Sequence, residues 1–221
     1  MCGRMTMTHP NDAMARLFEA APANDLPPVP RYNICPTQSV AVVTAGARRL
    51  RPMRWGFVPH WYKTPTDGPL LINARAETIA EKPAFRAAVR SRRCLIPATG
   101  FYEWTMGPED ARLPWYFMAK DRAPLVFAGI WQDWGGDGTD PAMATCAIVT
   151  TGASDWMAKT HHREPVWLAP GDWARWLGET DAKAAPLMRP APPGTYERWR
   201  VDPRVNSNRA EGEALTHPIA A

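Results

Sequence analysis

Between residues 93 and 150 the chain reads RCLIP (93–97), GFYEW (100–104), PWYFMA (114–119), LVFAGIW (125–131) and TCAIVT (145–150). These segments are rich in β-branched and aromatic residues, which favour strands. No helical segment separates them, whereas the strands of a parallel, doubly wound sheet alternate with helices. The stretch therefore predicts an α+β fold with a barrel-like, mainly antiparallel β core and flanking helices.

The rest of the chain adds one further buried strand, SVAVVT (39–44), and several helices. Asn11 or Asp12 is expected to cap the first helix, because both side chains accept hydrogen bonds from helical N–H groups. The glycines of residues 133–142 predict a mobile surface loop. The predicted helices cover residues 13–20, roughly residues 79–91 and residues 171–179.

Length and composition describe one ordered globular domain. The 221 residues are 45% hydrophobic and 22% charged, which excludes wholesale disorder. No run of 18 apolar residues is present, and MCGRMTMTHP lacks the apolar core of a signal peptide. We expect a single domain over residues 1–221, with a C-terminal tail from about residue 209, in a cytoplasmic monomer.

The cysteines predict neither disulfides nor a metal site. Cys2, Cys35, Cys94 and Cys146 are widely spaced, without the clustered ligand spacing of zinc sites or the density of disulfide-rich secreted domains. The last three lie in apolar stretches, where a free cysteine packs as a small hydrophobic residue. We expect no metal and no cofactor.

The basic residues favour contacts with phosphate. The net charge is +4, and arginine far outnumbers lysine among the 26 basic residues. A guanidinium group can hold phosphate through two hydrogen bonds, which an ammonium group cannot do. Eleven tryptophans accompany the arginines, and exposed aromatic rings suit base stacking. A codon bias toward G·C-rich DNA would also explain the arginines, so composition alone leaves nucleic-acid binding open.

Cys2 would have two reactive groups if Met1 were removed. Its α-amine would titrate at about 7.7–8.0 and would be partly neutral at physiological pH. That amine can form a Schiff base with an aldehyde, and the thiol can then close on the imine to give a five-membered thiazolidine. An internal cysteine or lysine cannot perform both steps. The alternative is that position 2 is simply a small residue.

Other polar residues could assist such chemistry. Glu103 lies between aromatic residues, where desolvation would raise its pKa toward use as a general acid or base. His161 suits proton transfer near neutral pH, and Asn73 ends an apolar run. A solvent-facing glutamate, a surface histidine and a turn-forming asparagine are the alternatives. Nucleotide-binding loops, dinucleotide fingerprints, zinc-protease motifs and nucleophile elbows are absent from the sequence.

Seven ordered segments together resemble the SOS response-associated peptidase (SRAP) family of abasic-site processing proteins. The resemblance runs from Cys2 to about Asn208 and implies a single SRAP-like domain. Its segments are MCGR (1–4), RYNICPTQ (31–38), RWGFVP (54–59), LINARAET (71–78), RCLIPATGFYEW (93–104), THHREPVWL (160–168) and VNSN (205–208).

The resemblance also implies a function. Cys2, exposed by removal of Met1, would crosslink to the ring-opened aldehyde of an abasic site in single-stranded DNA and shield the strand from cleavage. Asn73 resembles the residue that positions the Cys2 adduct, Glu103 the acid or base for its formation and reversal, and His161 the histidine that assists sugar ring opening. The implied activity is lyase-like Schiff-base chemistry, and autoproteolytic peptidase activity is possible within the family. The protein would associate with the nucleoid when bound to DNA.

The same resemblance assigns DNA contacts. Phosphates would be held by Arg4, Arg75 and Arg163, with a further backbone contact at Thr150. Trp61 and Tyr62 resemble an aromatic wedge that stacks on bases beside the lesion. Glu164 departs from the family pattern, and we expect it to pair with Arg163 and weaken that phosphate contact.

Two other functions fit the same residues. In a cysteine peptidase or N-terminal-nucleophile hydrolase, the Cys2 thiolate would attack an amide. In a non-catalytic single-stranded DNA binding module, Cys2 would be incidental. Incubation with an abasic oligonucleotide distinguishes these two functions from abasic-site capture, since only capture gives a heat-stable adduct.

Overall fold

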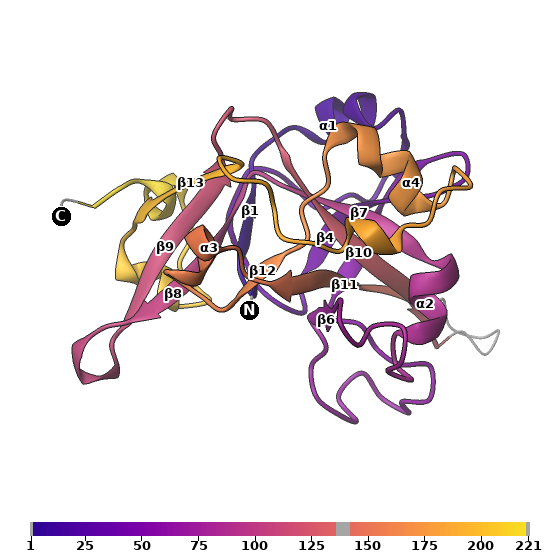
Figure 1. The fold of residues 1–221 in the computed structure, drawn as a ribbon, viewed down its shortest axis with the longest axis horizontal. Coiled ribbons are helices and arrows are strands. Elements are labelled where there is room, and N and C mark those ends of the chain that lie inside the picture. Colours follow the sequence, from indigo (N-terminus) through magenta and orange to yellow (C-terminus); the bar gives the residue numbers. More distant parts are fainter. Residues whose placement is uncertain (1, 136–141, 220–221) are drawn as a thin grey trace.

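The computed structural model describes residues 2–135 and 142–219, which form two β-sheets with short helices around them (Figure 1). The larger sheet has eight strands and the smaller has five. Both sheets are built mainly from antiparallel pairs, and this confirms the predicted fold class. Most of the predicted loop at 133–142 lies outside the described residues, while Asp133 and Trp134 belong to a strand.

The larger sheet closes on itself into a barrel. Five strands follow one another through antiparallel pairs, and a parallel contact of Thr145 and Cys146 with Arg54 and Trp55 joins the last strand to the first. Closure removes exposed sheet edges and gives the strands a common interior. The barrel strands are β4 (Ser39–Thr44), β5 (Arg49–Trp55), β7 (Arg93–Ala98), β10 (Leu125–Trp134) and β11 (Met143–Gly152).

Three short strands extend the barrel. Two of them flank β11: one pairs with it in parallel and the other antiparallel. The third pairs in parallel with β5. They are β2 (Ala21–Pro22), β6 (Asn73–Arg75) and β12 (Arg163–Pro165).

The smaller sheet is wholly antiparallel and places the N-terminal residues beside the barrel. Its order is β13-β9-β8-β1-β3. β8 follows β7 almost directly, so the chain passes from barrel to second sheet at Thr99. The strands are β1 (Met5–Met7), β3 (Arg31–Ile34), β8 (Gly100–Met106), β9 (Arg112–Ala119) and β13 (Tyr196–Arg200).

The α-helices are short: α1 (Asn11–Leu17), α2 (Arg86–Ser91), α3 (Asp155–Ala158) and α4 (Trp173–Leu177). The prediction of a helix from residue 79 was wrong, because residues 79–85 form turns. Pro83 disfavours helical backbone at Lys82. The predicted cap was also wrong: Pro10 occupies the cap position, and the Asn11 side chain donates to the Pro27 carbonyl instead.

One large hydrophobic cluster fills the barrel and continues under the second sheet. Cys2 is part of it, and all four cysteines are buried and free; burial was predicted for Cys35, Cys94 and Cys146 from their apolar contexts, but not for Cys2. A smaller cluster lies on the far side of the second sheet. Leu215, in the predicted tail, is buried there beside Val205, so the residues after 209 pack on the domain.

Candidate functional site

Cys2 and Asn73 meet where the second sheet adjoins the barrel. β6 pairs in parallel with β11, and this pairing places Asn73 opposite Ile148. From there the Asn73 side-chain Nδ2 donates to the Cys2 carbonyl oxygen at 3.0 Å. The Asn73 Oδ1 is buried and has no hydrogen-bond partner among the described residues. A fixed amide with a spare acceptor therefore lies against Cys2.

The Cys2 side chain is fully buried. Burial raises the pKa of its thiol far above the ordinary value, and the nearby Glu103 carboxylate raises it further. A neutral thiol is therefore the stable form in this environment, since removing a thiolate from water is costly.

Glu103 lies on β8, and only 2% of its surface is exposed. The alternative of a solvent-facing strand glutamate is thereby excluded. Burial raises the pKa of its carboxyl above the ordinary value. The protonated form, which a general acid needs, therefore extends to higher pH than in an exposed glutamate.

His161 follows α3 and is partly buried. Its Nδ1 lies 3.0 Å from the Arg163 backbone nitrogen and 3.1 Å from the Arg163 carbonyl oxygen. In the neutral tautomer in which Nδ1 accepts from the Arg163 N–H, the proton is on Nε2. Burial lowers the pKa of His161, so the neutral ring dominates at physiological pH. The exposed ring of His162 stacks on it with 4.4 Å between centroids.

Arg163 is held by Glu77 rather than by its neighbour Glu164. Its guanidinium donates to both Glu77 oxygens, at 2.7 and 2.9 Å, and to the Thr150 carbonyl at 2.7 Å. The expected Arg163–Glu164 pair was wrong because alternate residues of β12 point to opposite faces. Glu77 was missed in the sequence, although it lies two residues after Arg75 in the same motif.

Glu164 is fully buried and acts as an acceptor for the backbone. Its carboxylate accepts from the Ser154 N–H and hydroxyl, both at 2.8 Å, and from the Ala191 N–H at 2.6 Å. These contacts join β12 to the segments that precede α3 and β13, and so help to fix the position of the His161 loop.

We predict that Glu164→Ala destabilises the protein by about 3 kcal/mol, because buried donors lose a charged acceptor. Glu77→Ala is the matched control: the Glu77 side chain is 49% exposed, although that of Arg163 is only 11% exposed, and its loss should cost less, about 1 kcal/mol. Urea unfolding followed by tryptophan fluorescence measures both. Equal losses for the two variants would contradict the assigned role of Glu164.

The expected DNA-contact residues differ in exposure. Trp61 is 49% exposed, and Tyr62 lies beside it with 6.3 Å between ring centroids. Arg75 is exposed, whereas Thr150 is fully buried and contacts Arg163. Arg4 donates to the Asn33 side chain and the Val205 carbonyl, both at 2.6 Å. Only Trp61 and Arg75 therefore present largely open side chains.

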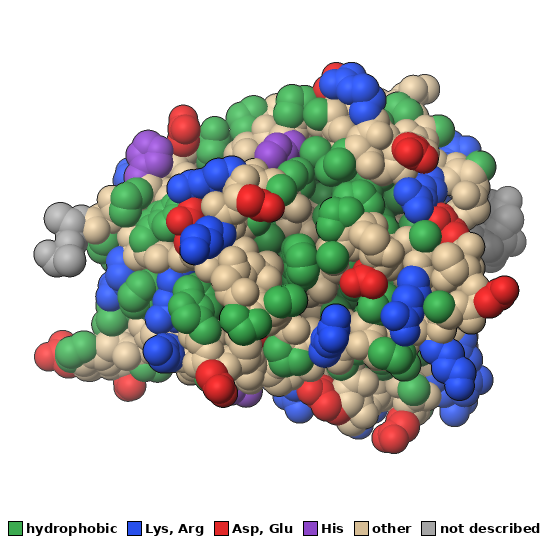
Figure 2. Space-filling model, turned by 45° about the horizontal axis from the view of Figure 1, so that its top comes forward, with side chains coloured by type: hydrophobic (Ala, Val, Ile, Leu, Met, Phe, Trp, Pro, Cys, Tyr) green, Lys and Arg blue, Asp and Glu red, His purple; other side chains and the backbone are tan. Residues whose placement is uncertain are grey.

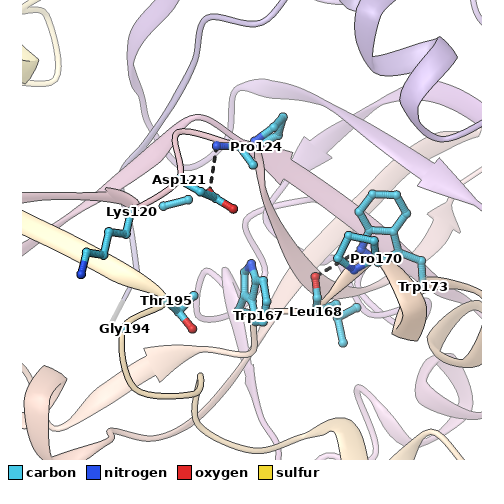
Figure 3. Close-up of a pocket in the computed structure, with 11 residues that line it drawn as sticks. Lys120, Asp121, Pro124, Trp167, Leu168, Pro170, Trp173, Gly194 and Thr195 are labelled. Atoms are coloured by element: carbon cyan, nitrogen blue, oxygen red, sulfur yellow. Dashed lines mark hydrogen bonds between the residues drawn. The ribbon is translucent and has the colours of Figure 1, made fainter.

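The other surfaces of the described residues show no further catalytic centre. On the face shown in Figure 2, basic, acidic and hydrophobic side chains are interspersed. The pocket in Figure 3 has a volume of about 380 Å³ and contains Trp167, Trp173, Lys120 and Asp121. None of the candidate catalytic residues lines it. Asn73 and Glu103 lie instead beside Cys2.

Comparison with known proteins identifies the family. A family model described as SOS response associated peptidase (SRAP) matches residues 1–208. This chain belongs to the SRAP family. It is 36% identical to the abasic site processing protein YoaM of Bacillus subtilis over 97% of each chain. It is 27% identical to the abasic site processing protein YedK of Escherichia coli, covering 99% of this chain and 100% of the relative.

Solved structures share this SRAP fold. A protein from Bacteroides thetaiotaomicron superposes with a TM-score of 0.86 at 23% identity, covering 99% of this chain and 100% of that one. A phage-related protein from Bordetella bronchiseptica gives a TM-score of 0.70 at 29% identity, covering 90% and 94%. The resemblance inferred from the seven sequence segments is confirmed.

Proposed function

We propose that this SRAP protein captures abasic sites in single-stranded DNA as a covalent adduct of Cys2, once Cys2 is the amino-terminal residue. The observation that carries the proposal is the meeting of Cys2, Asn73 and Glu103. The Asn73 Nδ2 lies 3.0 Å from the Cys2 carbonyl oxygen, and the charge of the buried Glu103 raises the pKa of the Cys2 thiol. The relatives named for abasic site processing support the substrate class.

The first step forms an imine. The neutral α-amine of Cys2 attacks the C1′ aldehyde of the open sugar and forms a carbinolamine. Protonated Glu103 donates a proton to the departing hydroxyl, which leaves as water. The nitrogen proton then returns to the Glu103 carboxylate, and a neutral imine remains. The spare Asn73 Oδ1 would accept from the amine and direct its lone pair toward the aldehyde. A buried acid suits this step because its raised pKa extends the protonated form to higher pH.

The second step closes the ring. The Cys2 sulfur adds to the imine carbon, its proton passes to the nitrogen, and a thiazolidine results without an oxidant or reductant. The thiol adds in its neutral form or transfers its proton as it attacks, which agrees with its raised pKa. A peptidase that depends on a preformed Cys2 thiolate is disfavoured by the same burial.

His161 would open the sugar before capture. An abasic sugar is mainly a closed hemiacetal, and opening it requires a proton at the ring oxygen. In the tautomer in which Nδ1 accepts from the Arg163 N–H, the Nε2–H of a neutral His161 can donate there. The lowered pKa of His161 keeps this neutral form in the physiological range.

The DNA would be held through its backbone and by stacking. Arg75 lies at the end of β6, two residues after Asn73, and Trp61 offers an open ring. We expect Arg75→Ala to lower the salt dependence of single-strand binding by about 0.7 in the log–log slope, the value for one phosphate contact. Trp61→Ala should weaken binding about tenfold at every salt concentration.

Fluorescence anisotropy with oligonucleotides of different sequence measures both effects. Arg16→Ala is a control, because this exposed arginine on α1 pairs with Asp12. A strong preference of the wild type for one base sequence would contradict the model, since phosphate contacts and stacking do not read sequence.

The direct test of function uses wild-type protein and an oligonucleotide with one abasic site. We expect a heat-stable adduct whose intact mass equals protein without Met1 plus DNA minus one water. A protein that binds the strand but gives no adduct would be a binding module.

We also propose a monomeric protein that acts in the cytoplasm and associates with the nucleoid through DNA. No described helix is long and apolar enough to span a membrane.

A further inference from the structure

Two arginines and two tryptophans form a continuous strip beside the candidate site, outside every motif shared with the family. Trp115 lies on β9, Arg198 and Arg200 on β13, and Trp156 on α3. The Arg198 guanidinium lies 4.7 Å from the Trp115 ring and 4.9 Å from the Trp156 ring. Arg200 lies 5.4 Å from the Trp115 ring. We call these four residues the arginine–tryptophan strip.

Strand register places the strip on the same face of the second sheet as Glu103. Glu103 pairs with Trp115 across β8 and β9, and Trp115 pairs with Arg200 across β9 and β13. Directly opposed residues project to the same side. Because adjacent strands are about 4.8 Å apart, Arg200 begins about 10 Å from Glu103. The strip therefore starts within a few nucleotides of the reacting centre.

The positive charge of the strip is uncompensated. Neither Arg198 nor Arg200 forms an ion pair with a described acid, in contrast to Arg163 with Glu77. Arg198 donates to the Thr160 hydroxyl, and the buried Nε of Arg200 has no partner among the described residues. Two half-buried cations that share one indole ring repel each other unless an anion joins them.

The nearest acids do not neutralise the strip. Glu197 is the neighbour of Arg198 in sequence, but alternate residues of β13 face opposite sides, and Glu197 pairs with Arg122 at 2.8 Å. Asp155 is exposed in the first turn of α3 and has no ion pair among the described residues. One exposed carboxylate against two guanidinium groups leaves a net positive surface.

The strip also borders space for a ligand. A groove of about 880 Å³ is lined by Trp156, Arg198 and Tyr196, by three prolines, and by the charged residues Lys120, Asp155 and Glu197. Trp156 is 38% exposed. An open indole beside unpaired guanidinium groups matches a nucleotide, whose base stacks on the ring while its phosphate accepts from arginine.

We infer that the arginine–tryptophan strip binds the single-stranded DNA that flanks the abasic nucleotide on one side, opposite the side of Trp61. This inference rests on the proposed function for the position of the abasic nucleotide. The strand would run from Trp61 past Cys2 and Glu103 onto β9, β13 and α3. Its phosphates would be held by Arg198 and Arg200, and a base would stack on Trp156.

The test compares two abasic oligonucleotides, one with the lesion near its 5′ end and one with it near its 3′ end. Only one of them has a flanking strand long enough to reach the strip. We expect the Arg198→Gln/Arg200→Gln double variant and Trp156→Ala each to slow capture of that one about tenfold or more at limiting protein, from lost stacking or phosphate contacts. Capture of the other should change less than about twofold. Arg16→Gln is the control for loss of surface charge.

Equal effects on both oligonucleotides, or none, would overturn the inference. Its failure is separable from failure of the proposed function, because binding of an intact dT20 strand is measured as well. There the double variant should lower the log–log salt slope by about 1.4, for two phosphate contacts. Wild-type protein without an adduct refutes the proposed function. An unchanged salt slope in the double variant refutes the strip.

Discussion

Blocking the α-amine of Cys2 will abolish the covalent adduct with abasic DNA, even though the thiol is intact. A form that retains Met1, or one with an N-terminal tag, has no amine on Cys2 and cannot form the Schiff base. We expect the yield of adduct by intact mass to fall below detection. DNA binding should persist, because Arg75 and Trp61 do not depend on that amine.

Side-chain variants of Cys2 separate the two steps. In processed Cys2→Ser and Cys2→Ala proteins the amine remains, so borohydride should still trap an imine. The heat-stable product should be lost in Cys2→Ala and impaired in Cys2→Ser, whose oxygen would close a more labile ring. A stable adduct from the Met1-retaining protein at wild-type yield would refute the mechanism. A peptidase that uses only the thiol would tolerate the blocked amine.

Glu103→Gln will slow adduct formation by about 10²–10⁴-fold, the usual contribution of a general acid or base. The substitution preserves size and removes the exchangeable carboxyl proton. In the wild type the raised pKa of Glu103 keeps the acid form present above its ordinary range, and the rate should fall as pH rises through that pKa. This limb of the pH–rate profile should be missing in Glu103→Gln.

Single-turnover rates across pH, with DNA affinity measured in parallel, check the prediction. Affinity should stay within about twofold of wild type, because Glu103 contacts no phosphate in the proposed mode. Asp133→Asn is the control for loss of a carboxyl group on another strand. Asp133 lies on β10 and pairs with Arg51 of β5 at 3.5 Å. An unchanged pH profile in Glu103→Gln would show that another group supplies the proton.

Much of the fold is encoded locally. The strands at 93–104, 114–119, 125–131 and 145–150 were predictable because β-branched and aromatic residues repeat there without helical spacing. The burial of Cys94 and Cys146 follows from the same apolar runs. The helix predicted from residue 79 begins only at Arg86, because Pro83 disfavours helical backbone at Lys82 despite the periodic apolar pattern.

The candidate site was only partly predictable. Cys2, Asn73, Glu103 and His161 could be named from residue chemistry and ordered motifs, but their proximity could not, since it depends on strand pairings between distant segments. Barrel closure is one such case: Cys146 of β11 meets Trp55 of β5 across 91 positions. Parallel pairing of β6 with β11 then brings Asn73 to Cys2.

The sequence alone determined the fold class, the burial of Cys35, Cys94 and Cys146, and the family, because local propensities and ordered motifs are properties of contiguous residues. Tertiary structure alone decided which charges are paired. Glu164 is adjacent to Arg163 in the chain but faces the interior, while Glu77, far away in sequence, holds the guanidinium. Sheet register also places Arg198 and Arg200 beside Trp115 without acidic partners among the described residues, and the sequence does not show this arrangement. Electrostatic pairing depends on distance and burial in space, and neither is set by separation along the chain.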